Sequence, residues 1–297
     1  MKTWLKAIAL LGIGVLCTPA FGANPARPGT VNYIEGAAYL NQKQLNQQDV
    51  GTVAMDAGQV LTTGQGRAEI LLTPGIYVRL GYHSALKMLS PDLAETKVEL
   101  QRGHAGVEVD EIHSQNDIRM IDGGVPTQLV KRGYYEFTAG HPETVVFKGQ
   151  AEVEESNGKY REVKGHHELA LAEGTQEKPQ KLNVDKAEDQ LYNWSSLRSQ
   201  YLAEANNQIA GEYAGVPGFY PGWYWDPYMW DYTFIGMDPF WSPFGFGFFP
   251  PWYGFYGSGF YGGGCIYRGG GFRGSGGFHG GGFSGGGGFH GGGGGRR

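Results

Sequence analysis

Short alternations of apolar and polar residues fill the chain from residue 28 to residue 172. Segments such as "AEILL", "YVRL", "GVEVDEI" and "YYEFTA" are rich in Val, Ile, Leu and Tyr, and Gly, Pro and Asn separate them. A period of two over four to eight residues is typical of β-strands. The pattern therefore predicts an all-β domain over residues 28–172, built as stacked β-ribbons in a sandwich or a roll.

Two short stretches in this region predict tight turns. "SNGK" at 156–159 lies between the strand-like segments "AEVEE" and "YREVK". Asn157 and Gly158 both tolerate a positive φ, so we expect a hairpin with a type I′ turn. "TPGI" at 73–76 predicts a second turn, because Pro and Gly favour turn conformations.

A loose motif, G-x-A-x-(V/L), occurs at Gly36, Gly103 and Gly149. Each copy follows a strand-like segment, so we expect the glycine to turn or bulge the chain and the alternate residues to point inward. Chance recurrence in a β-rich chain is the alternative explanation.

The period changes from two to between three and four after a polar stretch. Residues 173–184, "EGTQEKPQKLNV", read as a linker, and residues 185–210 predict one amphipathic helix. Asp185 and Glu188 form an expected capping box, and Gly211 an expected end. The predicted apolar stripe consists of Ala187, Leu191, Trp194, Leu197, Tyr201, Ala205 and Ile209. Docking on the β domain is the favoured role, and binding a partner through Trp194 and Tyr201 is the alternative.

Aromatic residues then dominate residues 211–253. "PGWYWDPYMW" at 221–230 holds many rings but no Leu, Ile or Val, whereas buried cores mix rings with branched aliphatic residues. We therefore expect a sticky surface strip, hydrated by Asp226, Asp231 and Asp238, that stacks on sugar rings, settles at a lipid interface or binds other copies of the chain. Aggregation without function is the alternative. The candidate interaction residues are Trp194, Tyr201, Trp223, Trp225, Trp230, Trp241 and Trp252.

Glycine makes up most of residues 254–297, and we predict that this tail is disordered because ordering glycine loses much backbone entropy. Self-association through the tail stays open, since its Arg and aromatic residues are spaced as in self-associating Gly-rich segments.

Three stretches carry a resemblance to a known family. "GTVNYIEGAAYL", "VAMDAGQVLTTGQGRAEILLTPGIYVRLGYHSALKM" and "KVELQRGHAGVEV" resemble the FecR domain, and "NDIRMI" to "HELAL" resembles its second half. The resemblance implies a β fold and an exported or periplasmic location in a Gram-negative bacterium. Members of the family relay a signal from an outer-membrane receptor through a membrane helix to a cytoplasmic sigma-factor regulator. This chain shows neither that helix nor a cytoplasmic segment after its first 22 residues, so the relay is not simply carried over.

The first 22 residues predict a secretory signal peptide. Lys2 and Lys6 precede an apolar run, and Ala20 and Gly22 suit a cleavage site. The run is too short for a membrane anchor, and Leu16 before Cys17 argues against a lipoprotein. Cleavage would leave one cysteine, Cys265, which cannot form an intramolecular disulfide but could pair between two copies.

Charge argues against nucleic acid as a partner. The chain has 24 basic and 29 acidic residues; two lysines lie in the signal peptide and four arginines in the tail, which leaves 18 basic against 29 acidic side chains in residues 23–253. A body with a net charge of −11 would repel a polyanion.

Candidate chemistry is sparse, and no motif of a metalloprotease, serine hydrolase, P-loop or thioredoxin-like site is present. Glu108 and Asp110 share a strand face and suggest a glycosidase pair, although an exposed acidic face is the favoured interpretation. His166 and His167 should point to opposite faces, one solvated and one partly covered. His279, His290 and Cys265 form at most a weak metal site. We therefore expect no cofactor, no metal and no enzymatic activity.

The sequence favours a non-enzymatic exported protein that binds an envelope protein or polysaccharide, with no transmembrane segment in the mature chain. The alternative is a periplasmic signalling module that contacts an outer-membrane receptor or a sigma-factor regulator.

Overall fold

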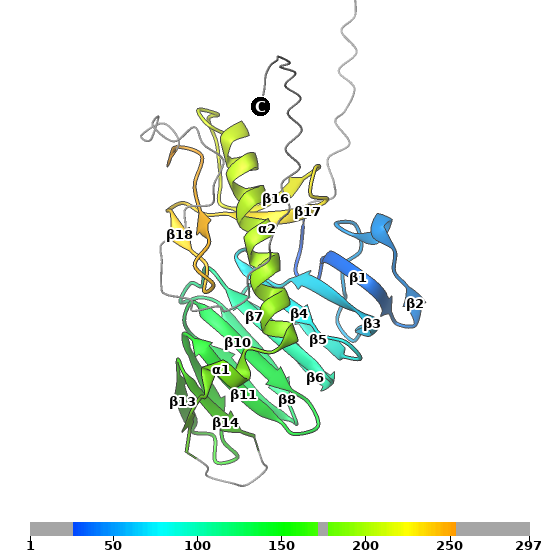
Figure 1. Ribbon diagram of the computed structural model, residues 1–297, viewed down its shortest axis with the longest axis vertical. Coiled ribbons are helices and arrows are strands. Elements are labelled where there is room, and N and C mark those ends of the chain that lie inside the picture. Colours follow the sequence, from blue (N-terminus) through cyan, green and yellow to red (C-terminus); the bar gives the residue numbers. More distant parts are fainter. Residues whose placement is uncertain (1–25, 172–177, 254–297) are drawn as a thin grey trace, which may run out of the picture. The chain divides into compact units, whose positions relative to one another are not determined.

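The computed structural model describes residues 26–171 and 178–253 of the chain (Figure 1). The predicted signal peptide, the Gly-rich tail and the first part of the predicted linker lie outside these residues. The elements in chain order are β1 (Val31–Leu40), β2 (Lys43–Gln44), η1 (Gln47–Asp49), β3 (Val60–Leu71), β4 (Ile76–Leu80), β5 (Ala85–Pro91), β6 (Glu95–Arg102), β7 (His104–Val109), β8 (Asp117–Asp122), β9 (Val125–Leu129), β10 (Gly133–Thr138), β11 (Glu143–Lys148), β12 (Gln150–Glu154), β13 (Tyr160–Lys164), β14 (His167–Ala170), β15 (Gln180–Lys181), α1 (Val184–Ala187), α2 (Gln190–Glu212), β16 (Gly222–Asp226), β17 (Asp231–Ile235), β18 (Phe240–Trp241) and β19 (Gly247–Phe248).

Strands β1 to β15 form one 15-stranded sheet, so the predicted all-β domain with one long helix is confirmed. The main path runs β13-β12-β9-β8-β6-β5-β3-β4-β7-β10-β11-β14-β15, with β1 on β3 and β2 on β1. Most neighbours are antiparallel, but β6 and β8 run parallel. The long strand β3 pairs at one end with β5 and at the other with β4.

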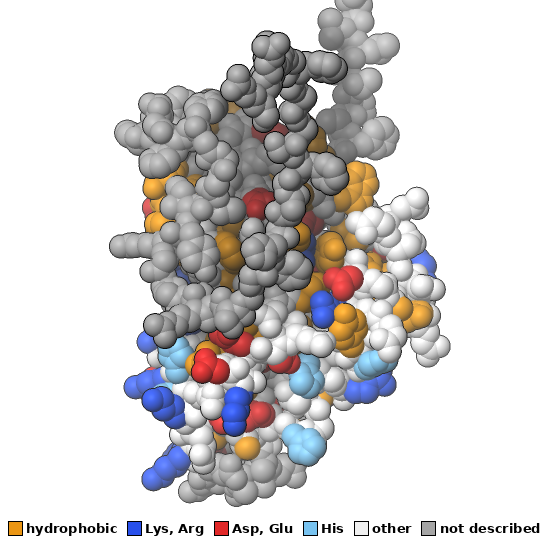
Figure 2. Space-filling model, viewed as in Figure 1, with side chains coloured by type: hydrophobic (Ala, Val, Ile, Leu, Met, Phe, Trp, Pro, Cys, Tyr) orange, Lys and Arg blue, Asp and Glu red, His pale blue; other side chains and the backbone are white. Residues whose placement is uncertain are grey.

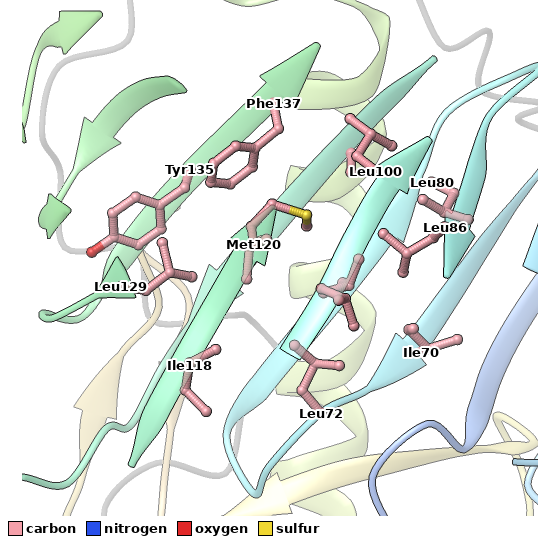
Figure 3. Packing of buried hydrophobic residues seen from close by; sticks show 14 of the residues in the cluster. Ile70, Leu72, Leu80, Leu86, Leu100, Ile118, Met120, Leu129, Tyr135 and Phe137 are labelled. Atoms are coloured by element: carbon pink, nitrogen blue, oxygen red, sulfur yellow. The ribbon is translucent and has the colours of Figure 1, made fainter. Parts of the chain in front are cut away.

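Alternate residues of the strands build one large aliphatic core. Figure 3 shows how side chains such as Ile70, Leu80, Met120 and Phe137 reach from neighbouring strands into a shared layer. Most of this core is fully excluded from solvent, and each branched side chain so buried stabilises the fold by roughly 1.5–3 kcal/mol. The period of two in the sequence thus places one residue set of each strand in this layer.

The repeated glycine motif marks three backbone features of this sheet. Gly36, Gly103 and Gly149 all have positive φ, and Gly36 lies at a register shift between β1 and β3. Gly103 and Gly149 join β6 to β7 and β11 to β12. The alanine two positions later is fully buried in each copy, as Ala38, Ala105 and Ala151. The expectation that the glycine redirects the chain and the alanine points inward is confirmed.

Both predicted turns exist, but one has a different geometry. Gly75 has positive φ, and the amide of Ile76 donates to the carbonyl of Thr73 at 2.8 Å, which closes the β3–β4 hairpin. At the β12–β13 hairpin Gly158 has positive φ whereas Asn157 does not. The type I′ prediction is therefore wrong, because the loop is longer than two residues and its glycine alone supplies the left-handed conformation.

The long helix begins later than the sequence predicts, at Gln190. The described part of the expected linker contains β15, which pairs with β14, and a single turn, α1, precedes the long helix. Asp189, rather than Asp185, caps α2: its Oδ1 accepts from the amides of Leu191 and Tyr192 at 2.7 and 2.9 Å. The capping box at Asp185 and Glu188 is wrong because Glu188 still belongs to the turn that ends α1.

The segment after α2 forms two small ribbons, β16–β17 and β18–β19, and a second core. Phe234, Phe240 and Phe248 are buried together with Tyr77 of the sheet and Leu202 of α2. Phe240 and Phe248 stack with ring centroids 4.8 Å apart. Part of the aromatic strip that the sequence assigned to the surface is therefore interior, namely Tyr232, Phe234, Phe240 and Phe248, because the sheet and helix supply the aliphatic partners that the segment itself lacks.

Candidate interaction surface and the charged layer beneath it

The second face of strands β3, β4 and β7 carries charge, and α2 covers it (Figure 1). Glu69, Arg79 and Glu108 are fully buried there. The interpretation of Glu108 and Asp110 as an exposed acidic face is wrong: both are buried, with relative exposures of 0% and 1%. The alternation of residues along β7 correctly separates an apolar face from an acidic face. Helix α2, which comes much later in the chain, covers the acidic face and excludes water from it.

Two arginines link three carboxylates in what we call the charged layer, which comprises Glu69, Arg79, Glu108, Arg198 and Asp231. Arg79 Nε donates to Glu69 Oε2 at 2.7 Å, and Arg79 Nη1 donates to Glu108 Oε2 at 2.5 Å. Arg198 Nη2 of α2 donates to Glu69 Oε1 at 2.9 Å and to Asp231 Oδ2 at 2.8 Å. The layer therefore ties α2 to the sheet and to the β16–β17 ribbon at once.

Neutral side chains complete the hydrogen bonds of this layer. Ser199 Oγ donates to Glu108 Oε1 at 2.6 Å, and Asn32 Nδ2 donates to Glu69 Oε1 at 2.9 Å. Asn32 also exchanges two hydrogen bonds with the backbone of Tyr232, 200 residues later in the chain. Carboxylates buried with this many donors are stabilised in the ionised form.

The pKa values in the layer diverge according to their partners. Burial alone would raise the pKa of Glu69, but Arg198 and Arg79 outweigh it and hold this pKa at about 2. Asp110 has no such partner, so burial and the neighbouring Glu108 carboxylate raise its pKa well above the usual value. The pKa values of Glu69 and Asp110 are therefore shifted in opposite directions.

A second polar cluster lies at the N-terminal end of α2. The hydroxyl of Tyr134 is 2.8 Å from Glu136 Oε1 and 2.9 Å from Ser195 Oγ. Burial, together with the charge of Asp189, raises the pKa of Glu136 to about 8. His104 Nδ1 lies 3.8 Å from Asp189 Oδ2, and the nearby Asp189 carboxylate raises the pKa of His104.

The buried face of α2 differs from the predicted apolar stripe. Leu197 and Tyr201 are 44% and 38% exposed, whereas the polar residues Arg198, Ser199 and Asn206 are buried. Leu191, Trp194, Ala205 and Ile209 of the predicted stripe are buried, so the stripe is correct in part. It fails at Leu197 and Tyr201, because the charged sheet face is met by polar side chains of the helix. Docking of the helix, the favoured role, is what the structure shows.

The candidate interaction residues fall into a covered group and an exposed group. Trp194 is 5% exposed, and its Nε1 donates to Glu35 Oε2 at 3.0 Å. Trp223 and Trp225 are half-buried, and Trp225 lies against Gly51, where an added Cβ would come within 2.4 Å of the ring. Trp230, Trp241 and Trp252 are 47%, 39% and 37% exposed.

Exposed and half-buried rings gather on what we call the aromatic surface, made of Phe219, Tyr224, Trp241, Phe249, Trp252 and Tyr253. Phe249 stacks on Tyr253 with centroids 4.6 Å apart, and Trp241 meets Phe249 edge-on at 6.3 Å. Phe219 stacks on Tyr224 and contacts Trp252 at 5.8 Å. On the face of the molecule drawn in Figure 2, exposed hydrophobic side chains are scattered between charged and histidine side chains.

Trp230 has an unusual backbone conformation. It ends the loop of the β16–β17 hairpin with φ of +61°, which is rare for a bulky residue, and its amide donates to the carbonyl of Asp226 at 2.8 Å. Its ring contacts Trp225 at 5.6 Å. Strain of this kind persists where surrounding structure fixes it, often at functional sites.

The aspartates expected to hydrate this segment are divided. Asp238 is exposed, but Asp226 and Asp231 are fully buried, so that part of the expectation is wrong. Asp226 and Asp231 lie opposite each other as the last residue pair of the β16–β17 ladder. Asp226 instead accepts from the loop amides of Tyr228 and Met229, and Asp231 accepts from Arg198.

The remaining sequence candidates show no clustered chemistry in the described residues. His166 is exposed and His167 half-buried, as expected from their alternation. Residues 26–171 and 178–253 bring no three His, Cys, Asp or Glu side chains into a metal-binding group. Over the same ranges, no helix combines the length and the apolar character needed to span a bilayer. His279, His290 and Cys265 lie outside the described residues.

Comparison with known proteins adds a fold likeness of limited extent. No family profile matches the chain, and no curated protein matches it. Two crystal structures of a "putative anti-sigma factor" from Parabacteroides distasonis ATCC 8503 are similar, at 2.50 Å and 1.65 Å resolution. Each is 12% identical with a TM-score of 0.37, and the match covers 43% of this chain and 62% of that one. A likeness this weak leaves function to be argued from the residues described above.

The sequence interpretation missed Arg79 and Arg198, the two residues that organise the charged layer. A signal existed in both cases. Arg79 interrupts the apolar strand Ile76–Leu80, and Arg198 lies four residues after Trp194 on the same helix face. A strand arginine between aliphatic residues needs a buried acid, and Glu69 and Glu108 on neighbouring strands supply it.

Proposed function

We propose that this chain is an exported, non-enzymatic protein that binds another component of the cell envelope through its aromatic surface. The observation that carries the proposal is that Trp241, Trp252 and Tyr253 keep more than a third of their surface exposed while neighbouring rings fix them in place. Rings that are already ordered lose little entropy on binding, and Trp and Tyr are enriched among residues that dominate binding energy.

The exported location rests on the N-terminal sequence. Lys2 and Lys6, the apolar run and the small residues at Ala20 and Gly22 have the order of a secretory signal. Cell fractionation of the full chain tests this part: we expect it outside the cytosol and shortened at its N-terminus. Recovery at full length in the cytosol would contradict it.

Binding is tested with a double variant, Trp241→Ala with Trp252→Ala, in the full chain. Loss of two anchor rings should weaken binding to purified envelope polysaccharide or envelope protein by several hundred-fold, because each anchor contributes on the order of 2 kcal/mol. The matched control is Leu93→Ala with Tyr160→Ala, which removes two side chains 54% and 49% exposed on the β domain. Equal binding by the double variant and wild type would contradict the proposal.

A periplasmic signalling module is the second candidate, supported by the resemblance of the β domain to the FecR domain. In that case an outer-membrane receptor or a sigma-factor regulator would bind the sheet domain. The Trp241/Trp252 double variant would then bind that partner as tightly as the wild type.

A further inference from the structure

The β16–β17 hairpin has two buried aspartates paired across its ladder, next to the loop. Asp226 and Asp231 are Cα partners in the ladder, so their side chains project from the same side of the ribbon. Both are 0% exposed. Among the described residues, Asp226 Oδ2 and Asp231 Oδ1 have no hydrogen-bond partner.

The charges around this pair do not balance. Arg198 of α2 is the cation in contact with Asp231, and it is shared with Glu69 of β3. Arg79 of β4 is divided between Glu69 and Glu108 of β7. The groups packed here from β1 are neutral: Asn32, and the ring of Tyr33 under the Arg198 guanidinium. With Asp226 included, four buried carboxyl groups (Glu69, Glu108, Asp226 and Asp231) are matched by two guanidinium groups.

We propose that Asp226 and Asp231 share one proton between their two unpartnered oxygens, and that this proton locks the hairpin bearing Trp230 onto α2. An O–H···O bond between the two carboxyls would satisfy both orphan atoms and remove one negative charge from the dry layer. Asp231 would keep its other oxygen on Arg198. This shared proton does not depend on what the aromatic surface binds.

Acid should strengthen the lock. Burial, with the nearby charges of Glu69 and Asp226, outweighs the pull of Arg198 and raises the pKa of Asp231 to about 6. A hairpin that opens exposes Asp231, whose pKa then returns to about 3.9. The closed state therefore gains the proton, and its population relative to the open state should rise about tenfold between pH 7 and pH 5.

Hydrogen exchange of the full chain tests this inference. Amide protection over Gly222–Ile235, corrected for the intrinsic effect of pH, should rise about tenfold from pH 7 to pH 5 in the wild type. Asp226→Asn supplies an N–H donor to Asp231 without a shared proton, so its protection should no longer change with pH. Asp238→Asn, which alters an exposed aspartate of the same segment, should behave as the wild type.

Two results would overturn the proposal. One is protection in the wild type that is unchanged between pH 7 and pH 5. The other is an equal gain at pH 7 on adding millimolar Ca²⁺ or Mg²⁺, which would identify the pair as a cation site. Carboxyl ¹³C NMR of the wild type keeps the test decisive if Asp226→Asn fails to fold. One Asp resonance of the pair should then titrate near pH 6, and titration of both below about pH 5 would refute the shared proton.

Discussion

The two faces of strands β4, β7 and β10 are both buried, yet they are covered by different chemistry. On one face Val78, Val107 and Phe137 join the aliphatic core. On the other, Arg79, Glu108 and Glu136 meet α2. Non-directional packing holds the first face, whereas the second requires named donor and acceptor pairs. The difference shows that polar alternation along a strand identifies a second face but not whether water reaches it.

Arg79→Ala should have the largest effect, because it leaves Glu69 and Glu108 buried without their shared cation. We expect a loss of about 3–5 kcal/mol in the free energy of unfolding at pH 7. Leu80→Ala on the core face should cost a similar 2–5 kcal/mol by leaving a cavity. Urea unfolding at pH 7 measures both.

The two losses should separate in acid. At pH 2.5 the carboxyl groups left by Arg79→Ala can take up protons, so this variant should approach the wild type, while the defect of Leu80→Ala should persist. An Arg79→Ala loss below about 1 kcal/mol at pH 7 would show that the charged layer contributes little.

Acidification of the wild type should have the next largest effect. The pKa of Glu69 is lowered to about 2 in the folded chain, so its contribution is fully present above about pH 4.5 and is lost as pH falls toward 2. We expect about 2 kcal/mol less stability at pH 2.5 than at pH 5 from this group. Glu69→Gln should remove that part of the pH dependence, and exposed Glu162→Gln should leave it intact.

Asp189→Ala should have the smallest effect, because it removes the cap of α2 without touching the charged layer. Two backbone amides, those of Leu191 and Tyr192, would lose their acceptor. The expected loss is about 1 kcal/mol, measured by thermal unfolding. Asp185→Ala is the matched control, since this exposed residue caps nothing in α2 and should change stability by less than about 0.5 kcal/mol. A larger loss of stability for Asp185→Ala than for Asp189→Ala would show that Asp185 is the cap, as the sequence predicted.

Local chemistry was readable from the sequence wherever one residue type decides the backbone. The turns at Gly75 and Gly158 and the redirections at Gly36, Gly103 and Gly149 follow from the positive φ that glycine accepts. The existence of the sheet and of the long helix follows from their periods.

Features that depend on distant partners were not readable. Asp185 and Asp189 are equally good N-cap residues by residue type. The position of α2 on the sheet decides that Asp189 is the cap. Glu108, Asp226 and Asp231 resemble surface residues until α2 and the final ribbon cover them. The aromatic segment resembled a wholly exposed strip for the same reason, since its aliphatic partners Leu71 and Leu202 come from other elements.

The hydrogen bonds between Asn32 and Tyr232 have a consequence for how the chain reaches its native state. The first strand finds this partner only after some two hundred further residues have been added, and long-range closures of this kind are slow. In a chain that ended before α2, the side chains of Glu69, Arg79 and Glu108 would be exposed to water. Docking of α2 and of the β16–β17 ribbon, rather than formation of the β core, is then the event that dries the charged face.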